Sequence, residues 1–182
     1  MFEIGEMIIH RDHGLCKIAG IEHVAYVDKD YFVLYPNANE STKIMIPCEM
    51  ANSICRKVVS KEECLKVIEE YNLIADEIIK DNKKRKEEYT KLLHSDNLKD
   101  LVYLIKMLDL LFEEKSSLNK VIGTIDSSLY NEARKKLYSE ITYVLELESE
   151  EETEIFLNNK WKKELSEVNP QIVHKIKKDL LW

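Results

Sequence analysis

Hydrophobic and polar residues follow two different patterns along the chain, and the pattern changes near residue 60. Up to that point, apolar residues form short runs rich in β-branched and aromatic side chains, separated by turn residues such as Gly14. Four or five short antiparallel strands in so short a segment predict a small SH3-like or Tudor-like β-barrel. The runs that we predict as strands are residues 7–9, 15–21, 24–27, 31–34 and 44–46, with a turn at residues 28–30.

Beyond residue 60, apolar residues recur at three and four residues, which is the spacing of amphipathic helices. Ser60 and Glu63 have the spacing of a capping box that begins a helix. We predict that this helix reaches Asn72 and that another starts near Leu73. Asp96 is the predicted cap of a further helix, whose apolar face contains Leu101, Leu104, Ile105, Leu108 and Leu111.

The last predicted helix begins with Ser127 or Ser128 as its cap, after a segment without sustained periodicity at residues 116–125. The glutamate-rich residues 146–154 then interrupt the apolar pattern. We interpret them as a solvated connector rather than as a strip that mimics polymerase or DNA. The apolar positions of the last helix are Leu129, Ala133, Leu137, Ile141 and Val144.

These patterns predict an α+β protein, in which the small N-terminal β-barrel precedes an all-α helical C-terminal domain. We place the β-domain at residues 1–58, a linking helix at 59–72 and the helical domain at 73–157. Residues 158–182 form a tail whose structure the pattern does not define.

Composition supports folded cores and argues against autonomous DNA binding. The 182-residue chain is 45% hydrophobic and 34% charged, with four Gly and three Pro. Its formal net charge is -7, whereas nucleic-acid binders gain affinity by neutralising phosphates with basic surfaces. A local basic patch can still contact DNA once another protein holds it nearby, because tethering raises its effective concentration.

Nothing in the sequence points to a membrane, metal or catalytic role. The N-terminus lacks the segments of a signal peptide and no run of eighteen apolar residues occurs, so we expect a cytoplasmic protein with no membrane partner. The four cysteines have no C-x-x-C spacing, which favours reduced, buried thiols over a zinc site. Because no catalytic motif is present, we expect a binding protein rather than an enzyme, with no cofactor and no small-molecule substrate.

One cluster of basic residues precedes the helix that contains Leu101. Acidic residues at three- and four-residue offsets within the cluster allow ion pairs on the helix surface. The other interpretation is contact with DNA phosphates, with the basic face presented by a docked partner. The cluster contains Lys80, Lys83, Lys84, Arg85, Lys86 and Lys91, together with Asp81, Glu87 and Glu88.

Several short motifs occur in an order typical of one family. In the β-domain they are Phe2-x-Ile4-Gly5-Glu6-x-Ile8-Ile9, His13-Gly14, Ile18, Ile21-Glu22, Tyr31-x-Val33-Leu34, Ile46-Pro47 and Arg56. In the helical part they are Lys91-Leu92-Leu93-x-Ser95-Asp96 and Glu132-Ala133-Arg134-x-x-Leu137-x-Ser139-Glu140. Over about residues 1–157, the chain resembles the CarD and CdnL family, whose polymerase-interacting β-domain is shared with transcription-repair coupling factor.

The resemblance implies a bacterial transcription regulator whose Tudor-like domain binds the β subunit of RNA polymerase. An edge strand at residues 42–46, or the segment 24–27, would pair with a polymerase strand. The helical domain would stabilise the open promoter complex through non-sequence-specific contacts with the promoter DNA backbone, which are weak on their own. The implied contact residues are Val24, Ala25, Tyr26, Lys43 and Met45 for polymerase, and Lys83, Lys84, Arg85 and Lys86 for DNA.

Some positions depart from the family. Characterised members carry arginines where this chain has Val24 and Met45, so we expect a more apolar polymerase contact. The tryptophan that wedges into the minor groove in such members aligns near Asp81, so the resemblance carries over phosphate contact but not a wedge. This departure and the acidic balance motivate a second hypothesis, in which the protein is an adaptor that binds polymerase or another protein without DNA contact.

Overall fold

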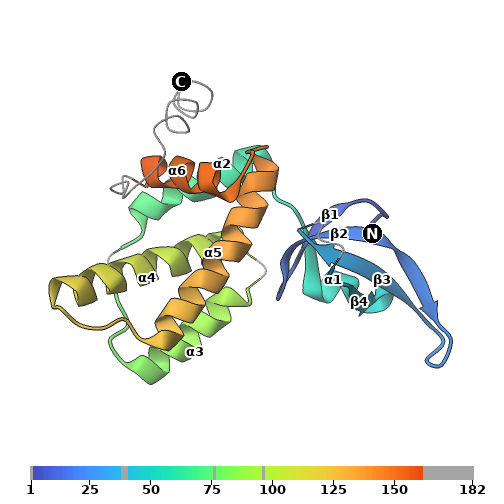
Figure 1. Ribbon diagram of the computed structural model, residues 1–182, viewed down its shortest axis with the longest axis horizontal. Coiled ribbons are helices and arrows are strands. Elements are labelled where there is room, and N and C mark those ends of the chain that lie inside the picture. Colours follow the sequence, from blue (N-terminus) through green and yellow to red (C-terminus); the bar gives the residue numbers. More distant parts are fainter. Residues whose placement is uncertain (1, 38–40, 76, 96, 162–182) are drawn as a thin grey trace. The chain divides into compact units, whose positions relative to one another are not determined.

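The chain forms two compact units in a computed structural model that describes residues 2–37, 41–75, 77–95 and 97–161 (Figure 1). The first unit comprises Met1–Val59 and His94–Asp96, and the second comprises Ser60–Leu93 and Asn97–Trp182, each as far as it is described. A β-sheet builds the first unit and helices build the second, which confirms the α+β class. The tail predicted from residue 158 is described as far as Trp161, and residues 162–182 lie outside the described residues.

A five-stranded antiparallel sheet with the order β4-β3-β2-β1-β5 forms the first unit. Within the described residues, β4 and β5 are its two edges and do not pair with each other, so closure into a barrel stays a prediction. A short helical segment, Cys48–Met50 and then α1 (Ala51–Ile54), precedes β5. The strands are β1 (Met7–His10), β2 (Gly14–Val24), β3 (Lys29–Pro36), β4 (Ile44–Pro47) and β5 (Cys55–Lys57).

The second and third strands differ from the prediction. The separate strand predicted at residues 24–27 is wrong, because β2 continues to Val24 and residues 25–28 form the turn of a β2–β3 hairpin. Asp28 takes a positive φ of 52° there, a conformation that Asp tolerates better than most residues. β5 was missed because a strand of three residues is too short to show a period of two.

The core of the first unit contains apolar side chains from all five strands and includes two of the cysteines. Cys16 and Cys55 are buried thiols outside any disulfide, as is Cys64 in the second unit, whereas Cys48 is half-buried, which confirms the prediction of mostly buried thiols. Burial raises the pKa of the Cys16 thiol to about 12, and it raises the pKa of Cys64 to about 12 as well. Both thiols are therefore protonated and unreactive near neutral pH.

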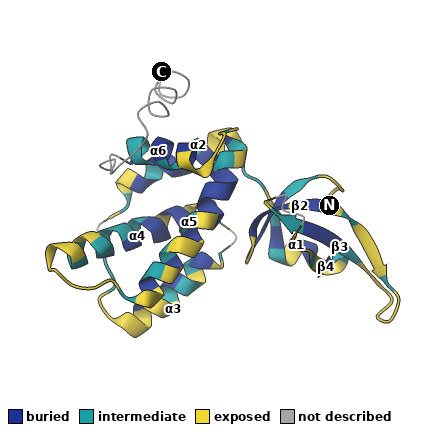
Figure 2. Cartoon of the chain, viewed as in Figure 1, coloured by how far each residue is buried: buried dark blue, intermediate teal, exposed yellow. Residues whose placement is uncertain are grey.

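Five helices build the described part of the second unit, and their inward faces carry most of the predicted apolar residues (Figure 2). Ser60 caps the first of them, since its Oγ accepts a hydrogen bond from the backbone N of Glu63 at 3.2 Å. All five apolar positions predicted around Leu101 are buried. The helices are α2 (Lys61–Glu70), α3 (Asn82–Leu93), α4 (Leu98–Ser117), α5 (Thr124–Val144) and α6 (Glu150–Lys160).

Three predicted helix starts are corrected or replaced. The start near Leu73 is wrong, because α3 begins at Asn82, where Oδ1 of Asp81 accepts a hydrogen bond from the backbone N of Lys84 at 2.7 Å. The start at Ser127 or Ser128 is wrong as well, since α5 begins at Thr124. For α4, Asn97 is the cap, and the predicted cap Asp96 lies outside the described residues.

The glutamate-rich segment is a connector only in its first part, residues 146–149, which join α5 to α6; its second part, residues 150–154, is helical, so the interpretation as a connector is wrong there. Ser149 Oγ caps α6 by accepting a hydrogen bond from the backbone N of Glu152 at 3.1 Å. In return, the Glu152 carboxylate accepts one from the backbone N of Glu148 at 2.6 Å. Carboxylates favour a helix N-terminus, where the backbone N–H groups point outward, and so the charge that suggested a solvated loop instead starts a helix.

Candidate functional site

The tip of the β2–β3 hairpin presents three of the residues predicted to bind polymerase. Val24 is the last residue of β2 and pairs with Lys29 of β3. Ala25 and Tyr26 lie in the turn, and the Tyr26 side chain is 90% exposed. A large aromatic side chain held out on a turn has no packing role within its own unit, so Tyr26 is suited to contact a partner.

The other two predicted residues, Lys43 and Met45, lie on the outward face of the sheet. Met45 pairs with Val33, and the next pair, Phe32 and Ile46, points into the core, so Met45 faces the opposite side. Lys43 Nζ reaches across this face to the Glu22 carboxylate, with Nζ–O distances of 2.7 and 2.8 Å. The strand that carries Met45, β4, is an edge of the sheet.

This unit has further exposed apolar residues, which the sequence analysis did not select. Ile21 pairs with the buried Phe32, yet it is half exposed because the hairpin extends beyond the core. Val27 in the turn and Met50 after β4 are also exposed. Periodicity alone cannot identify such residues, since it assigns a face to each residue but not the point at which the core ends.

Three of the four residues predicted to contact DNA lie on the surface of the second unit. Lys83, Lys84 and Lys86 belong to the first turns of α3 and are exposed. The other basic residues of the cluster have acidic partners: Lys91 Nζ lies 3.3 Å from Glu87 and 3.1 Å from Glu88. Within the described residues, none of the three exposed lysines forms such an ion pair.

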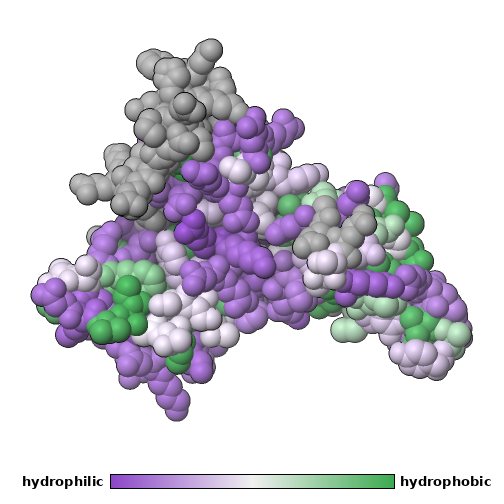
Figure 3. Space-filling model, viewed as in Figure 1, coloured by the Kyte–Doolittle hydropathy of each residue, from purple (hydrophilic) through white to green (hydrophobic). Residues whose placement is uncertain are grey.

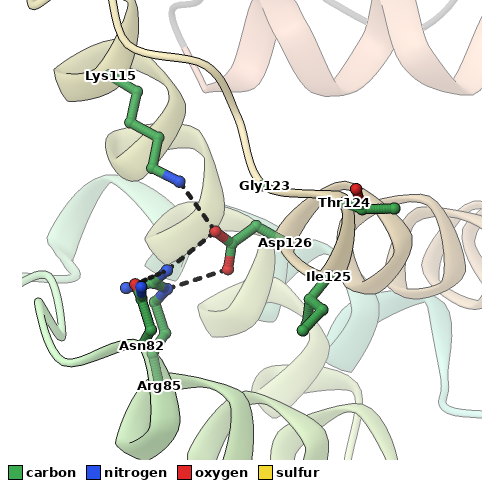
Figure 4. A pocket seen from close by; sticks show the side chains of 7 residues that line it. All are labelled: Asn82, Arg85, Lys115, Gly123, Thr124, Ile125 and Asp126. Carbon is green, nitrogen blue, oxygen red and sulfur yellow. Dashed lines mark hydrogen bonds and ion pairs between the residues drawn. The ribbon is translucent and has the colours of Figure 1, made fainter.

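Arg85 is buried, and its guanidinium forms hydrogen bonds with other groups of the protein (Figure 4). Nε and Nη2 donate to the two carboxylate oxygens of Asp126 at 3.0 and 2.9 Å, a bidentate pair. Nη2 also donates to Asn82 Oδ1 at 2.8 Å, and Nη1 donates to the Ile79 carbonyl at 3.0 Å. Because this side chain is not available to a phosphate, Arg85 is removed from the predicted DNA contacts and has a structural role.

Asp126 joins three helices through its carboxylate. Besides the pair with Arg85 of α3, Lys115 Nζ of α4 lies 3.1 Å from Asp126 Oδ2. Burial alone would raise the pKa of Asp126, but the hydrogen bonds from Arg85 and Lys115 outweigh it and lower the pKa below the ordinary value of 3.8. Asp126 is therefore charged at neutral pH. It lies in the first turn of α5, where a carboxylate is favourable, and this agrees with a helix that starts about one turn before Ser127 and Ser128.

A cavity of about 400 Å³ opens beside this ion pair, lined by Asn82, Arg85, Lys115 and residues 123–126 (Figure 4). Its charged groups already bind one another, so the cavity offers no arrangement for acid–base or nucleophilic chemistry.

In the described part of the chain, no group of three or more His, Cys, Asp or Glu side chains could hold a metal ion. None of the described helices is both long and apolar enough to cross a membrane.

Comparison with known protein families identifies the first unit. Residues 2–59 match the family model described as the CarD-like/TRCF RID domain. The match covers the five-stranded sheet and ends just before α2. No curated protein matches the chain.

Proposed function

Because residues 2–59 form a CarD-like/TRCF RID domain, we propose that this protein is a non-enzymatic transcription regulator that binds the β subunit of bacterial RNA polymerase. The family match is the observation that carries the proposal, because such domains interact with RNA polymerase. Its place of action would be the cytoplasm, where the polymerase is found.

The edge strand β4 and the hairpin tip are the proposed docking surface. β4 can add a polymerase strand to the sheet through its outer backbone groups, while its side chains fix the register. Met45 on the outward face and Tyr26 at the tip would supply apolar contacts. Lys43 would exchange its exposed pair with Glu22 for a polymerase carboxylate at little cost, because exposed pairs contribute little stability. Val24 and Ala25 complete the proposed surface.

The second unit is proposed to contact the promoter DNA backbone and stabilise the open complex. Lys83, Lys84 and Lys86 are exposed together on α3. Three lysines on a protein of net charge -7 bind phosphates weakly. Docking on polymerase raises their local concentration at the DNA, so weak contacts suffice to slow closure of the melted region.

A second candidate function is an adaptor that binds polymerase or another protein without DNA contact. The burial of Arg85 favours it, because one of the four cations predicted for DNA is used inside the unit. The two functions differ in a measurable way: only the first makes the lifetime of the open complex depend on the α3 lysines.

Calorimetric titration of the full chain with the purified polymerase β-subunit lobe tests the docking proposal. We expect binding, and we expect Tyr26→Ala and Met45→Ala each to weaken it by about tenfold, as for exposed apolar residues at the centre of an interface. Tyr143→Ala is the matched control, since Tyr143 is a half-exposed tyrosine of the second unit, outside the matched domain. Absence of binding by the full chain would refute the docking proposal.

The salt dependence of open-complex lifetime tests the DNA proposal. Neutralising Lys83, Lys84 and Lys86 to Gln is expected to shorten the lifetime and to reduce the salt slope of DNA binding by about 2 to 3, since each lost phosphate contact removes about 0.9. Neutralising Lys61, Lys66 and Lys135, which are exposed elsewhere on the second unit, is the control with the same charge change. Equal lifetimes and slopes for both triple variants and the wild type would instead support the adaptor.

A further inference from the structure

Two methionine side chains of the first unit are exposed, although methionine is more often found in protein interiors. Met45 of β4 is 37% exposed, and Met50, in the short helical segment after β4, is 48% exposed. Of the other described methionines, Met107 is buried and Met7 is half-buried. Figure 3 shows hydrophobic residues at the surface of the first unit, next to hydrophilic ones. The thioethers of Met45 and Met50 are therefore accessible to small molecules in water.

The sheet leaves the surroundings of Met45 open on two sides. Met45 pairs with Val33, and Val33 pairs on its other side with Gly20. Gly20 has no side chain, and apart from its chain neighbours no atom lies within 4 Å of the position that a Cβ would take there. Beyond Met45 no further strand follows, because β4 is an edge of the described sheet. A small molecule can thus approach Met45 from the outward face and from the edge.

The cysteines, which are common targets of oxidants, are protected in this chain. Oxidants react with the thiolate, so a buried and protonated thiol is a poor target. Cys16, Cys55 and Cys64 are buried, and burial raises the pKa of Cys16 and of Cys64 to about 12. Cys48 is half-buried, and its pKa is raised by burial and then by the nearby charge of Asp30. A methionine sulfur has no proton to lose, so its reactivity depends on exposure.

We propose that Met45 is a site of reversible oxidation by peroxides, and that the resulting sulfoxide weakens docking on polymerase. This inference rests on the proposed docking surface, which includes Met45, and adds a way to regulate it. In the reaction, the Met45 Sδ attacks one oxygen of hydrogen peroxide, the O–O bond breaks, and the hydroxyl now bound to sulfur passes its proton to the departing hydroxide. The sulfur loses two electrons, the peroxide is reduced, and the products are methionine sulfoxide and one water.

Oxidation changes Met45 from an apolar to a polar side chain. In the docked complex the sulfoxide oxygen would be removed from water, and an apolar contact offers it no hydrogen-bond donor in return, so docking becomes weaker. Met50 lies outside the proposed docking surface, so its oxidation leaves docking unchanged. The first unit thus contains one methionine whose oxidation affects docking and one that serves as an internal control.

Peptide mass spectrometry after a limited peroxide treatment tests the site itself. The full chain is treated with hydrogen peroxide, catalase removes the excess, and digestion locates the added oxygen. We expect sulfoxide at Met45 and Met50 before it forms at Met107, which is fully buried, and we expect the cysteines to stay reduced. Oxidation of Met107 as fast as that of Met45, or oxidation of a cysteine first, would overturn the inference.

Calorimetric titration of the oxidised full chain with the untreated polymerase β-subunit lobe tests the effect on docking. We expect oxidation to weaken binding by about tenfold, and treatment with both methionine sulfoxide reductases to restore it. Met45→Leu nearly conserves the side-chain volume, so this variant should bind as the wild type does and lose its sensitivity to peroxide. Met50→Leu is the matched control and should stay as sensitive as the wild type.

The possible outcomes separate this inference from the docking proposal. If the chain with sulfoxide at Met45 docks as tightly as the untreated chain, the inference is overturned and the docking proposal stands. The inference is also overturned if Met50→Leu, rather than Met45→Leu, removes the sensitivity, or if circular dichroism shows that oxidation unfolds the chain. Absence of binding by the untreated chain would instead refute the docking proposal, and this inference with it.

Discussion

Asp126→Asn is expected to destabilise the second unit by about 3 kcal/mol, because it leaves two cations without their shared carboxylate. The Arg85 and Asp126 side chains are only 5% and 7% exposed, so water cannot replace the lost interaction. Lys115, 19% exposed, loses its partner in the same step. Since Asp126 joins α3, α4 and α5, the substitution should lower the urea concentration at which the whole unit unfolds cooperatively.

Urea unfolding followed by far-ultraviolet circular dichroism measures this effect, because the helical signal comes mainly from the second unit. Glu154→Gln is the matched control: it removes the charge from a half-exposed pair with Arg134, and such pairs contribute about 0 to 1 kcal/mol. If Asp126→Asn lowers the free energy of unfolding no more than Glu154→Gln does, the buried pair does not hold the three helices together.

The lowered pKa of Asp126 adds a pH dependence of known sign. Its folded-state pKa lies below its ordinary value of 3.8, so the stabilisation is present above about pH 4 and is lost as the pH falls through the lowered folded value. The wild type should therefore lose more stability on acidification below about pH 4 than Asp126→Asn does, and the two proteins should converge at the lowest pH.

The Arg85 pair also shows where sequence reasoning reaches its limit. A run of Lys83, Lys84, Arg85 and Lys86 suggests one continuous basic surface, but a helix turns by about 100° per residue, so one of four consecutive residues commonly faces inward. The Arg85 partner, Asp126, is 41 residues away, and no local pattern connects them. The exposed lysines were therefore predictable from composition, whereas the buried arginine required the tertiary structure.

The elements with strong local signals were predicted well. The apolar spacing around Leu101 identified the buried face of α4, and Ser60 identified the start of α2, because both depend on neighbours within one or two turns. The start of α5 was misplaced because a long-range interaction, that of Asp126 with Arg85, lies there. The β2–β3 turn was misplaced because residues 24–27 are rich in β-branched and aromatic side chains, as a strand is. At the proposed docking surface, β4 was located correctly, but the outward face of Met45 follows from its register with Val33.

Trp161→Ala is the second substitution expected to have a large effect, with a loss of about 3 to 5 kcal/mol in the second unit. Trp161 directly follows α6 and is buried. Its ring stacks on Tyr71 with centroids 4.2 Å apart, and its Nε1 donates to the Ile68 carbonyl at 3.0 Å. The side chain thus fastens the end of α6 to residues about ninety positions earlier in the chain, beyond residue 157, where the sequence resemblance ended.

Two further variants separate the parts of this interaction. Trp161→Phe keeps an aromatic ring but removes the hydrogen bond from Nε1 to the Ile68 carbonyl, which keeps the backbone N of Tyr71 as a donor, so we expect a smaller loss of about 1 to 2 kcal/mol. Leu73→Ala, at an exposed position beside Tyr71, should stay within about 0.5 kcal/mol of the wild type. If Trp161→Ala unfolds at the urea midpoint of Leu73→Ala, α6 does not depend on this contact. If the helical signal of Trp161→Ala is instead lost in two steps, α6 unfolds in the first step. Trp161 then is the residue that couples α6 to the cooperative unfolding of the second unit.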